Sequence, residues 1–256
     1  MILENAFNDK IVLVTGGGSG IGFAIAKQYL ENGAKVVISG RNVEKLAKAK
    51  DELNKIGEVH TQICDIRKPE EITALADYIQ TAFGKLDILV NNAGGQFPSP
   101  AEAISVNGWT AVVNNNLNGT FYVTREMATR FFIPQNGGNI LNIIANIYRG
   151  FPGMAHTGAA RAGVDNLTKT LAVEWSKYKI RVNAIAPGII KSTGLDQYPP
   201  EILKDVIDTI PLRELGSTDD IAQATLFITS PYGKFITGAT LNIDGGQSLY
   251  GEVFKL

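Results

Sequence analysis

One stretch of the chain decides its fold: Ile11-Val12-Leu13-Val14-Thr15-Gly16-Gly17-Gly18-Ser19-Gly20-Ile21-Gly22. Its first four residues are apolar and mostly β-branched, which is typical of a strand buried on both faces. Residues 23–30 then have the pattern of a helix. Glycines between a strand and a helix let the backbone approach a pyrophosphate, and the helix N-terminus favours its negative charge. The spacing Thr-Gly-x-x-x-Gly-x-Gly therefore predicts a dinucleotide-binding turn.

The rest of the chain repeats the alternation of strand and helix. A doubly wound α/β fold follows, with ligands at the carboxyl ends of the strands. We expect a single Rossmann-type domain over residues 1–256, a parallel seven-stranded sheet flanked by helices, and a loop over 189–210 that acts as a substrate lid. Strands are predicted at 11–14, 35–39, 59–63, 86–90, 139–144, 180–185 and 240–243. Helices are predicted at 23–30, 43–53, 157–178 and 219–229. Another helix begins at Pro69, and a separate long helical region that includes Trp109 runs to about residue 132.

Composition excludes several classes of function. The chain has 256 residues, a net charge of -1 and 45% hydrophobic residues, so nothing favours binding to nucleic acid or to an anionic membrane. The lone Cys64 agrees with a reducing compartment, and two distant histidines give no metal-ligand spacing. The N-terminal residues do not resemble a signal peptide. These features predict a cytoplasmic protein.

The residues after the second strand bear on the choice of dinucleotide. An acidic side chain there would bond the adenosine ribose, whereas a basic one accommodates a 2′-phosphate. The chain has Gly40-Arg41 at this place and no acid. Since the arginine fork suits phosphate, we predict NADP(H), with Asp65 near the adenine after the third strand.

Five motifs resemble those of the short-chain dehydrogenase/reductase family along nearly the whole chain. They are Thr15-Gly16-x-x-x-Gly20-x-Gly22, Asn91-Asn92-Ala93-Gly94, Asn116-Leu117-Asn118-Gly119, Asn183-Ala184-Ile185-Ala186-Pro187-Gly188 and Asp244-Gly245-Gly246. The resemblance implies a homo-oligomer, with a tetramer expected. The cofactor contacts it implies are Gly16, Ser19, Gly20, Ile21, Gly22, Arg41, Asp65, Ile66, Asn92, Ala93, Gly94, Arg161, Pro187, Gly188 and Ile190.

The family's usual catalytic residues are mostly absent. Its serine would fall within Asn142-Ile143-Ile144-Ala145, and its Tyr-x-x-x-Lys slot contains Thr157 and Arg161. Only Asn116 is retained. Threonine has no acidity near that of a phenol, whose pKa is ~10, so Thr157 cannot protonate a ketone as tyrosine does. An ordinary alcohol dehydrogenase is therefore not expected.

These departures resemble two subgroups, the 2,4-dienoyl-CoA and the trans-2-enoyl-CoA reductases. The dienoyl-CoA reductases carry a tyrosine just after the fifth strand, where this chain has Tyr148, and an amide where it has Gln96. The enoyl-CoA reductases tolerate arginine at the lysine slot, here Arg161. The resemblance implies an acyl-CoA substrate.

Such a site needs donors for an enolate oxygen, which Tyr148 and Gln96 would supply with help from Asn116. Arg161 would hold the nicotinamide ribose. Other interpretations stay open: Tyr148 packs on Phe151, Gln96 is solvated, Thr157 caps its helix, or Arg161 pairs with Asp165. Two other functions also stay open, a carbonyl reductase with Tyr148 as a relocated acid and an inactive NADP-binding protein.

Overall fold

Strand β1 (Ile11–Thr15) lies inside the sheet, and all five of its residues are buried. It pairs in parallel with β2 (Lys35–Gly40) on one edge and with β4 (Ile88–Asn91) on the other. A strand that is paired on both edges and covered on both faces requires apolar side chains at nearly every position. This explains the unbroken hydrophobic run that precedes the glycine-rich turn.

The whole sheet confirms the predicted doubly wound α/β fold. The computed structural model describes residues 6–192 and 206–249, and within them seven parallel strands follow the order β3-β2-β1-β4-β5-β6-β9. The strand order reverses between β1 and β4, which is where such sheets bind ligands at their carboxyl edge. The other strands are β3 (Val59–Ile63), β5 (Gly138–Ile143), β6 (Ile180–Pro187) and β9 (Thr240–Ile243).

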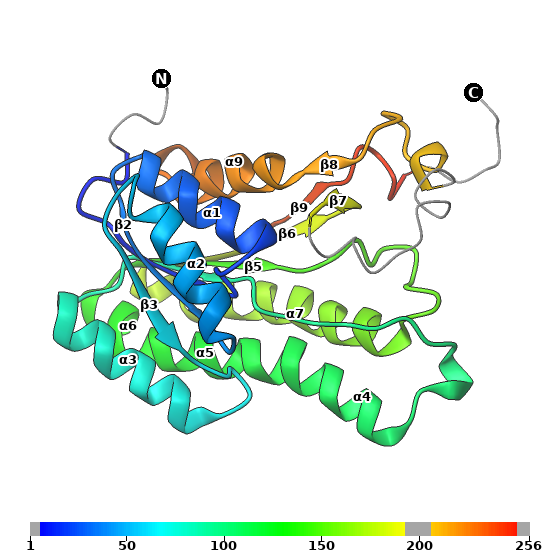
Figure 1. Cartoon of the computed structure of the whole chain (residues 1–256), viewed down its shortest axis with the longest axis horizontal. Helices are drawn as coiled ribbons and strands as arrows, with labels where there is room; N and C mark the ends of the chain where they lie inside the picture. Colours follow the sequence, from blue (N-terminus) through cyan, green and yellow to red (C-terminus); the bar gives the residue numbers. More distant parts are fainter. Residues whose placement is uncertain (1–5, 193–205, 250–256) are drawn as a thin grey trace.

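Helices cover both faces of the sheet (Figure 1). One face packs against α1 (Gly20–Glu31), α2 (Val43–Leu53) and α9 (Thr218–Thr229), whose buried residues join β1 and β2 in one core cluster. The other face packs against α3 (Pro69–Phe83), α5 (Gly119–Met127) and α7 (Ala155–Glu174). These helices leave the carboxyl ends of the strands uncovered, and the candidate site lies there.

Local sequence explains where several helices begin. The Asn42 side chain accepts a hydrogen bond from the Lys45 N–H at 2.8 Å and caps α2 as predicted. Pro69 occupies the first turn of α3, where its missing N–H costs nothing. Ser217 and Asp220 form a capping box at α9.

The predicted long helical region after β4 is present but is not a uniform α-helix. It begins after the 3₁₀ turn η1 (Ala101–Ala103), and two π-helical segments interrupt it. Such segments insert an extra residue per turn and frequently occur at functional sites. The segments are α4 (Val106–Val113), the π-helix η2 (Asn114–Asn118), α5, the π-helix η3 (Ala128–Phe132) and α6 (Ile133–Gln135).

Some predicted boundaries were wrong. Helix α7 begins two residues before Thr157 and ends at Glu174, followed by the 3₁₀ turn η4 (Ser176–Tyr178). At the predicted lid, β7 (Ile190–Lys191) pairs with β8 (Gly216–Ser217), while residues 193–205 lie outside the described part of the chain. A last 3₁₀ turn, η5 (Pro231–Gly233), follows α9. No helix in 6–192 or 206–249 has both the length and the hydropathy to cross a membrane.

Candidate active site

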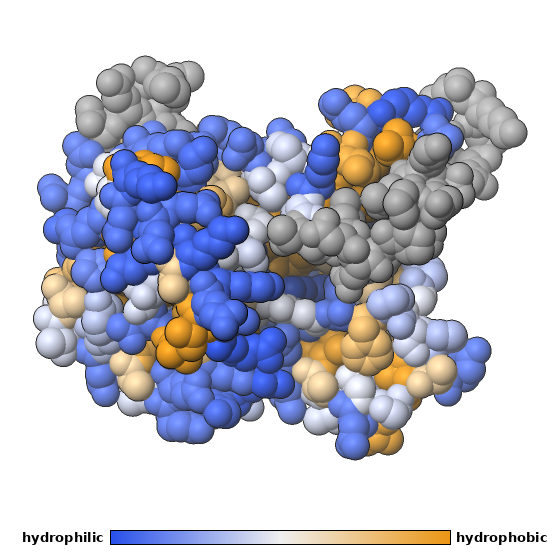
Figure 2. Space-filling model, viewed as in Figure 1, coloured by the Kyte–Doolittle hydropathy of each residue, from blue (hydrophilic) through white to orange (hydrophobic). Residues whose placement is uncertain are grey.

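A cleft of about 2170 Å³ lies along the carboxyl edge of the sheet. A pocket for one small ligand typically has ~300–1,000 Å³, so this cleft has room for two. Figure 2 shows mostly hydrophilic residues over α1 and α3, and a group of apolar residues over α4 and the loop before it. Exposed large apolar residues on that lower part are Phe97, Val106 and Trp109.

The glycine-rich turn forms one wall of the cleft. Gly16 and Gly20 have φ values of +67° and +55°, which glycine adopts without strain. A Cβ on Gly16 would lie 3.0 Å from the Ala93 Cα, so the turn needs this close approach. The Ser19 side chain makes no capping bond and the first turn of α1 holds no acid. The amides at the start of α1 therefore remain available to a phosphate group.

The loop after β4 is fastened to this turn. The Asn92 side chain donates to the carbonyl oxygens of Thr15 at 3.0 Å and Gly16 at 3.1 Å. The Thr15 hydroxyl in turn accepts the N–H groups of Asn92 and Ala93, at 3.1 and 3.0 Å. Gly22 lies beneath the turn and not on the cleft wall, since a Cβ there would clash with Asn92. The remaining predicted cofactor residues line the cleft: Ile21, Ile66, Gly94, Pro187, Gly188 and Ile190.

Basic side chains gather where β2 and β3 end. Arg41 and Lys45 line the cleft and make no hydrogen bond or ion pair through their side chains in the described residues. The Asp65 carboxylate is bound by Arg67, whose Nε donates at 2.9 Å, and this bond holds the pKa of Asp65 at about 2. Lys45 was not predicted. The Asn42 cap could have revealed it, because the cap places Lys45 in the first turn of α2.

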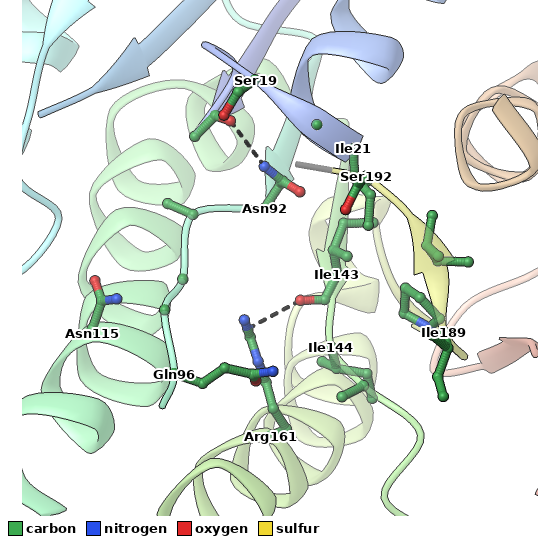
Figure 3. Close-up of a pocket in the computed structure, with 18 of the residues that line it drawn as sticks. Ser19, Ile21, Asn92, Gln96, Asn115, Ile143, Ile144, Arg161, Ile189 and Ser192 are labelled. Carbon is green, nitrogen blue, oxygen red and sulfur yellow. Dashed lines mark hydrogen bonds between the residues drawn. The ribbon is translucent and has the colours of Figure 1, made fainter. Parts of the chain in front are cut away.

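Arg161 is the charged group at the centre of the cleft. Its side chain rises from α7 between Gln96 and Ile143 (Figure 3), and its Nη1 donates to the Ile143 carbonyl at 3.0 Å. The residue is only 9% exposed, and burial lowers the pKa of Arg161 to about 10. It therefore remains charged at neutral pH.

Arg161 has no carboxylate partner among the described residues. The alternative that it pairs with Asp165 is wrong, because Asp165 binds Lys169 and accepts the Thr240 hydroxyl at 2.6 Å. A buried cation is costly unless it is paired or hydrogen-bonded. The remaining N–H groups of the Arg161 guanidinium can therefore donate hydrogen bonds to an oxygen atom of a ligand.

Asn116 positions the loop that carries Gln96. Its side chain donates to the Gly95 carbonyl at 2.7 Å and accepts from the Gly95 N–H at 3.3 Å. Asn116 is buried and does not line the cleft, whereas its neighbour Asn115 and Gln96 do. In Figure 3 the amide end of Gln96 points toward Arg161. Asn115, in the π-helical segment η2, was not predicted, since the sequence carries no signal of such a segment.

Thr157 and Tyr148 lie outside the group formed by Gln96 and Arg161. Thr157 is fully buried, and its N–H donates to His156 Nδ1 at 2.8 Å. Met154 is the N-cap of α7, so the interpretation of Thr157 as a cap is wrong. Tyr148 is 51% exposed and does not line the cleft, although the next residue, Arg149, does. Four residues were predicted to contact the enolate oxygen or the ribose, namely Tyr148, Gln96, Asn116 and Arg161. Of these, Gln96 and Arg161 lie together at the cleft surface.

Comparison with curated proteins reveals close relatives. The chain is 42% identical to a probable 2,4-dienoyl-CoA reductase [(2E)-enoyl-CoA-producing] of Bacillus subtilis, over 94% of this chain and 97% of the relative. It is 39% identical to a peroxisomal 2,4-dienoyl-CoA reductase [(3E)-enoyl-CoA-producing] of Pongo abelii, over 97% of this chain and 87% of the relative.

Solved structures share the fold and reach similar identity. A short-chain dehydrogenase from Bacillus anthracis is 42% identical, with a TM-score of 0.87 over 94% of this chain and 97% of the other. A 7α-hydroxysteroid dehydrogenase complexed with NADH and a 7-oxo bile acid is 33% identical, with a TM-score of 0.90 over 94% and 96%. The family model described as enoyl-(acyl carrier protein) reductase matches residues 16–248. The chain therefore belongs to the short-chain dehydrogenase/reductase family of oxidoreductases, which bind nicotinamide cofactors.

Proposed function

We propose that this protein is an NADPH-dependent reductase of the C=C bond of enoyl-CoA or 2,4-dienoyl-CoA thioesters. The observation that carries the proposal is the chemistry of the cleft centre, where a buried Arg161 without a carboxylate lies beside the Gln96 amide. These groups donate hydrogen bonds to an oxygen but are poor proton donors, because a guanidinium keeps its proton at neutral pH. The names of the relatives support the same substrate class.

The residues of the turn fit a nicotinamide dinucleotide. The amides at the start of α1 would hold the pyrophosphate, and Arg161 with the loop after Asn92 would hold the nicotinamide ribose. Arg41 and Lys45 would bind the adenosine 2′-phosphate. Bound NADPH would supply the hydride for reduction of the conjugated C=C bond, and the second hydrogen would come as a proton from water.

The chain's own contribution is to stabilise the charge that this addition leaves on the thioester oxygen. Gln96 N–H and the Arg161 guanidinium would donate to the enolate oxygen, and Asn116 would hold the Gln96 loop in place. Tyr148 would be a third donor. Its side chain would have to turn into the cleft when substrate binds. The substrate would be an acyl-CoA, and the protein would act in the cytoplasm.

Substrate assays test this proposal. With NADPH, the purified protein should reduce crotonyl-CoA or 2,4-hexadienoyl-CoA, and Gln96→Ala should lower kcat by ~10²–10³, the cost of losing one oxyanion donor. Tyr148→Phe should also lower kcat if Tyr148 donates, whereas Thr157→Val should have much less effect. Faster reduction of a ketone such as acetoacetyl-CoA would favour the carbonyl reductase. Cofactor binding without turnover of any of these substrates would favour the inactive NADP-binding protein.

A further inference from the structure

The charges along the cleft differ from those of the chain as a whole. Although the chain has a net charge of -1, five of the seven charged side chains on the described cleft wall are basic. Both acids are neutralised, Asp65 by Arg67 and Asp208 by Arg213, whose Nη1 also donates to the Asp208 carbonyl at 2.7 Å. Such a positive cleft concentrates anionic ligands.

The cations without a carboxylate partner are not gathered at one end of the cleft. Arg41 and Lys45 follow β2, whereas Arg149 follows β5, which is three strand spacings away, or about 14 Å along the sheet. Arg149 makes no side-chain hydrogen bond or ion pair within residues 6–192 and 206–249. Arg41 and Arg149 therefore lie beyond the ends of different strands, where they can serve different phosphate groups.

The backbone around Arg149 is well anchored. The Asn146 side chain donates to Asp244 Oδ2 at 3.0 Å, and the Asn146 N–H donates to the Pro187 carbonyl at 3.2 Å. Gly150 closes a turn on Ile147 at 3.1 Å with a φ of +77°. These bonds fix the backbone on both sides of Arg149 and so place this exposed residue at the cleft rim.

We infer that Arg149 binds a phosphate group of the coenzyme A portion of the substrate, at a subsite separate from that of the dinucleotide. This inference rests on the proposed function, in which the substrate is an acyl-CoA. Coenzyme A carries three phosphate groups on its nucleotide, while the acyl group and pantetheine arm are neutral. An arginine at the rim would recognise the nucleotide and leave the acyl group to reach Arg161 and Gln96.

Kinetics with a truncated substrate test the inference. Arg149→Gln should lower kcat/KM for crotonyl-CoA, relative to crotonyl-pantetheine, by about tenfold or more, because only the first thioester carries phosphates. Arg149→Lys should retain much of this preference. Lys55→Gln removes a cation from the exposed turn that follows α2, outside the cleft, and is the matched control. An unchanged ratio, or an altered KM for NADPH instead, would overturn the inference.

A binding measurement separates this inference from the proposed function. With NADP+ saturating, adenosine 3′,5′-bisphosphate should bind the wild-type protein at the second subsite and bind Arg149→Gln about tenfold more weakly, by calorimetry. If the wild type reduces no acyl-CoA but shows this difference, the proposed function fails and the anion subsite stands. If it reduces crotonyl-CoA but binds both variants equally, the subsite fails and the proposed function stands.

Discussion

Arg161 occupies a position where the family resemblance leads one to expect lysine, and the two side chains respond differently to burial. Burial lowers the pKa of a cation, but the pKa of Arg161 starts so high that it falls only to about 10. A buried lysine starts from ~10.4 and would fall toward neutrality. Arginine therefore keeps the positive charge over the physiological range.

This difference predicts a change in pH dependence. In wild type, kcat/KM for the enoyl-CoA should not fall between pH 7 and 9 through loss of the charge at position 161. In Arg161→Lys it should fall as the pH rises, because raising the pH through the lowered lysine pKa removes the cation. Initial rates measured from pH 6 to 10 decide the matter, and parallel profiles for the two proteins would contradict it.

Arg41 governs a second prediction at this scale. Its guanidinium is exposed at the cleft beside the end of β2 and has no ion-pair partner in the described residues. Arg41→Ala should raise the KM for NADPH by about tenfold and leave the KM for NADH nearly unchanged, since only NADPH carries the 2′-phosphate. Equal stabilisation of the wild type by both cofactors in a melting experiment would argue against this role.

Among the elements, the π-helix η2 links architecture to the site most directly. Its extra residue leaves Asn116 buried against Gly95 and turns Asn115 to the cleft. Asn118 belongs to the same segment, but its side chain donates only to Asn114 Oδ1, at 2.7 Å, and does not line the cleft. The two asparagines therefore offer a matched pair of substitutions.

Asn116→Ala should reduce kcat for the enoyl-CoA at least tenfold while the protein stays folded. The reason is that the substitution removes the amide that fixes Gly95 and thereby frees the Gln96 loop. Asn118→Ala should change stability by only ~1 kcal/mol and leave kcat within a factor of two. Steady-state kinetics and denaturant unfolding give both readouts. Similar kcat losses in both variants would show that η2 acts through general stability.

The elements also show what was predictable from sequence. Strand β1 and the starts of α2 and α3 were predicted because burial on two faces, an asparagine cap and a first-turn proline leave local patterns. The π-helical segments leave no such pattern. The orientation of Tyr148 depends on neighbours that only the fold brings together. The same holds for Asp165, which binds Lys169 and Thr240 and not Arg161. Local sequence therefore could not decide either question.

At the scale of the whole molecule, exposed apolar residues gather near one edge of the sheet. Among the described residues, strand β9 pairs with β6 alone. Leu241 on this strand is 39% exposed, and Phe235, five residues before the strand begins, is almost fully exposed. An open sheet edge can pair with another chain, and exposed apolar patches mark surfaces of interaction. They support the expected homo-oligomer, in which closed symmetry is the common arrangement.

Light scattering should give a mass near 110 kDa at micromolar concentration, four times the 27.5 kDa of one chain. Phe235→Asp should shift the assembly toward smaller species, because it places a charge in the apolar contact. The exposed Lys55→Gln should not change the mass. A monomeric mass for the wild type would refute the tetramer.

The bond between Asn146 and Asp244 joins residues that are synthesised far apart in time. The glycine-rich turn emerges first, but Asp244, which anchors the loop after β5, emerges almost last. A nascent chain can therefore form the strands around the glycine-rich turn before the loop after β5 has this anchor. A product truncated before β9 would keep every other strand of the sheet but lack the tether of the loop that carries Arg149, so we expect it to bind acyl-CoA more weakly than it binds the dinucleotide.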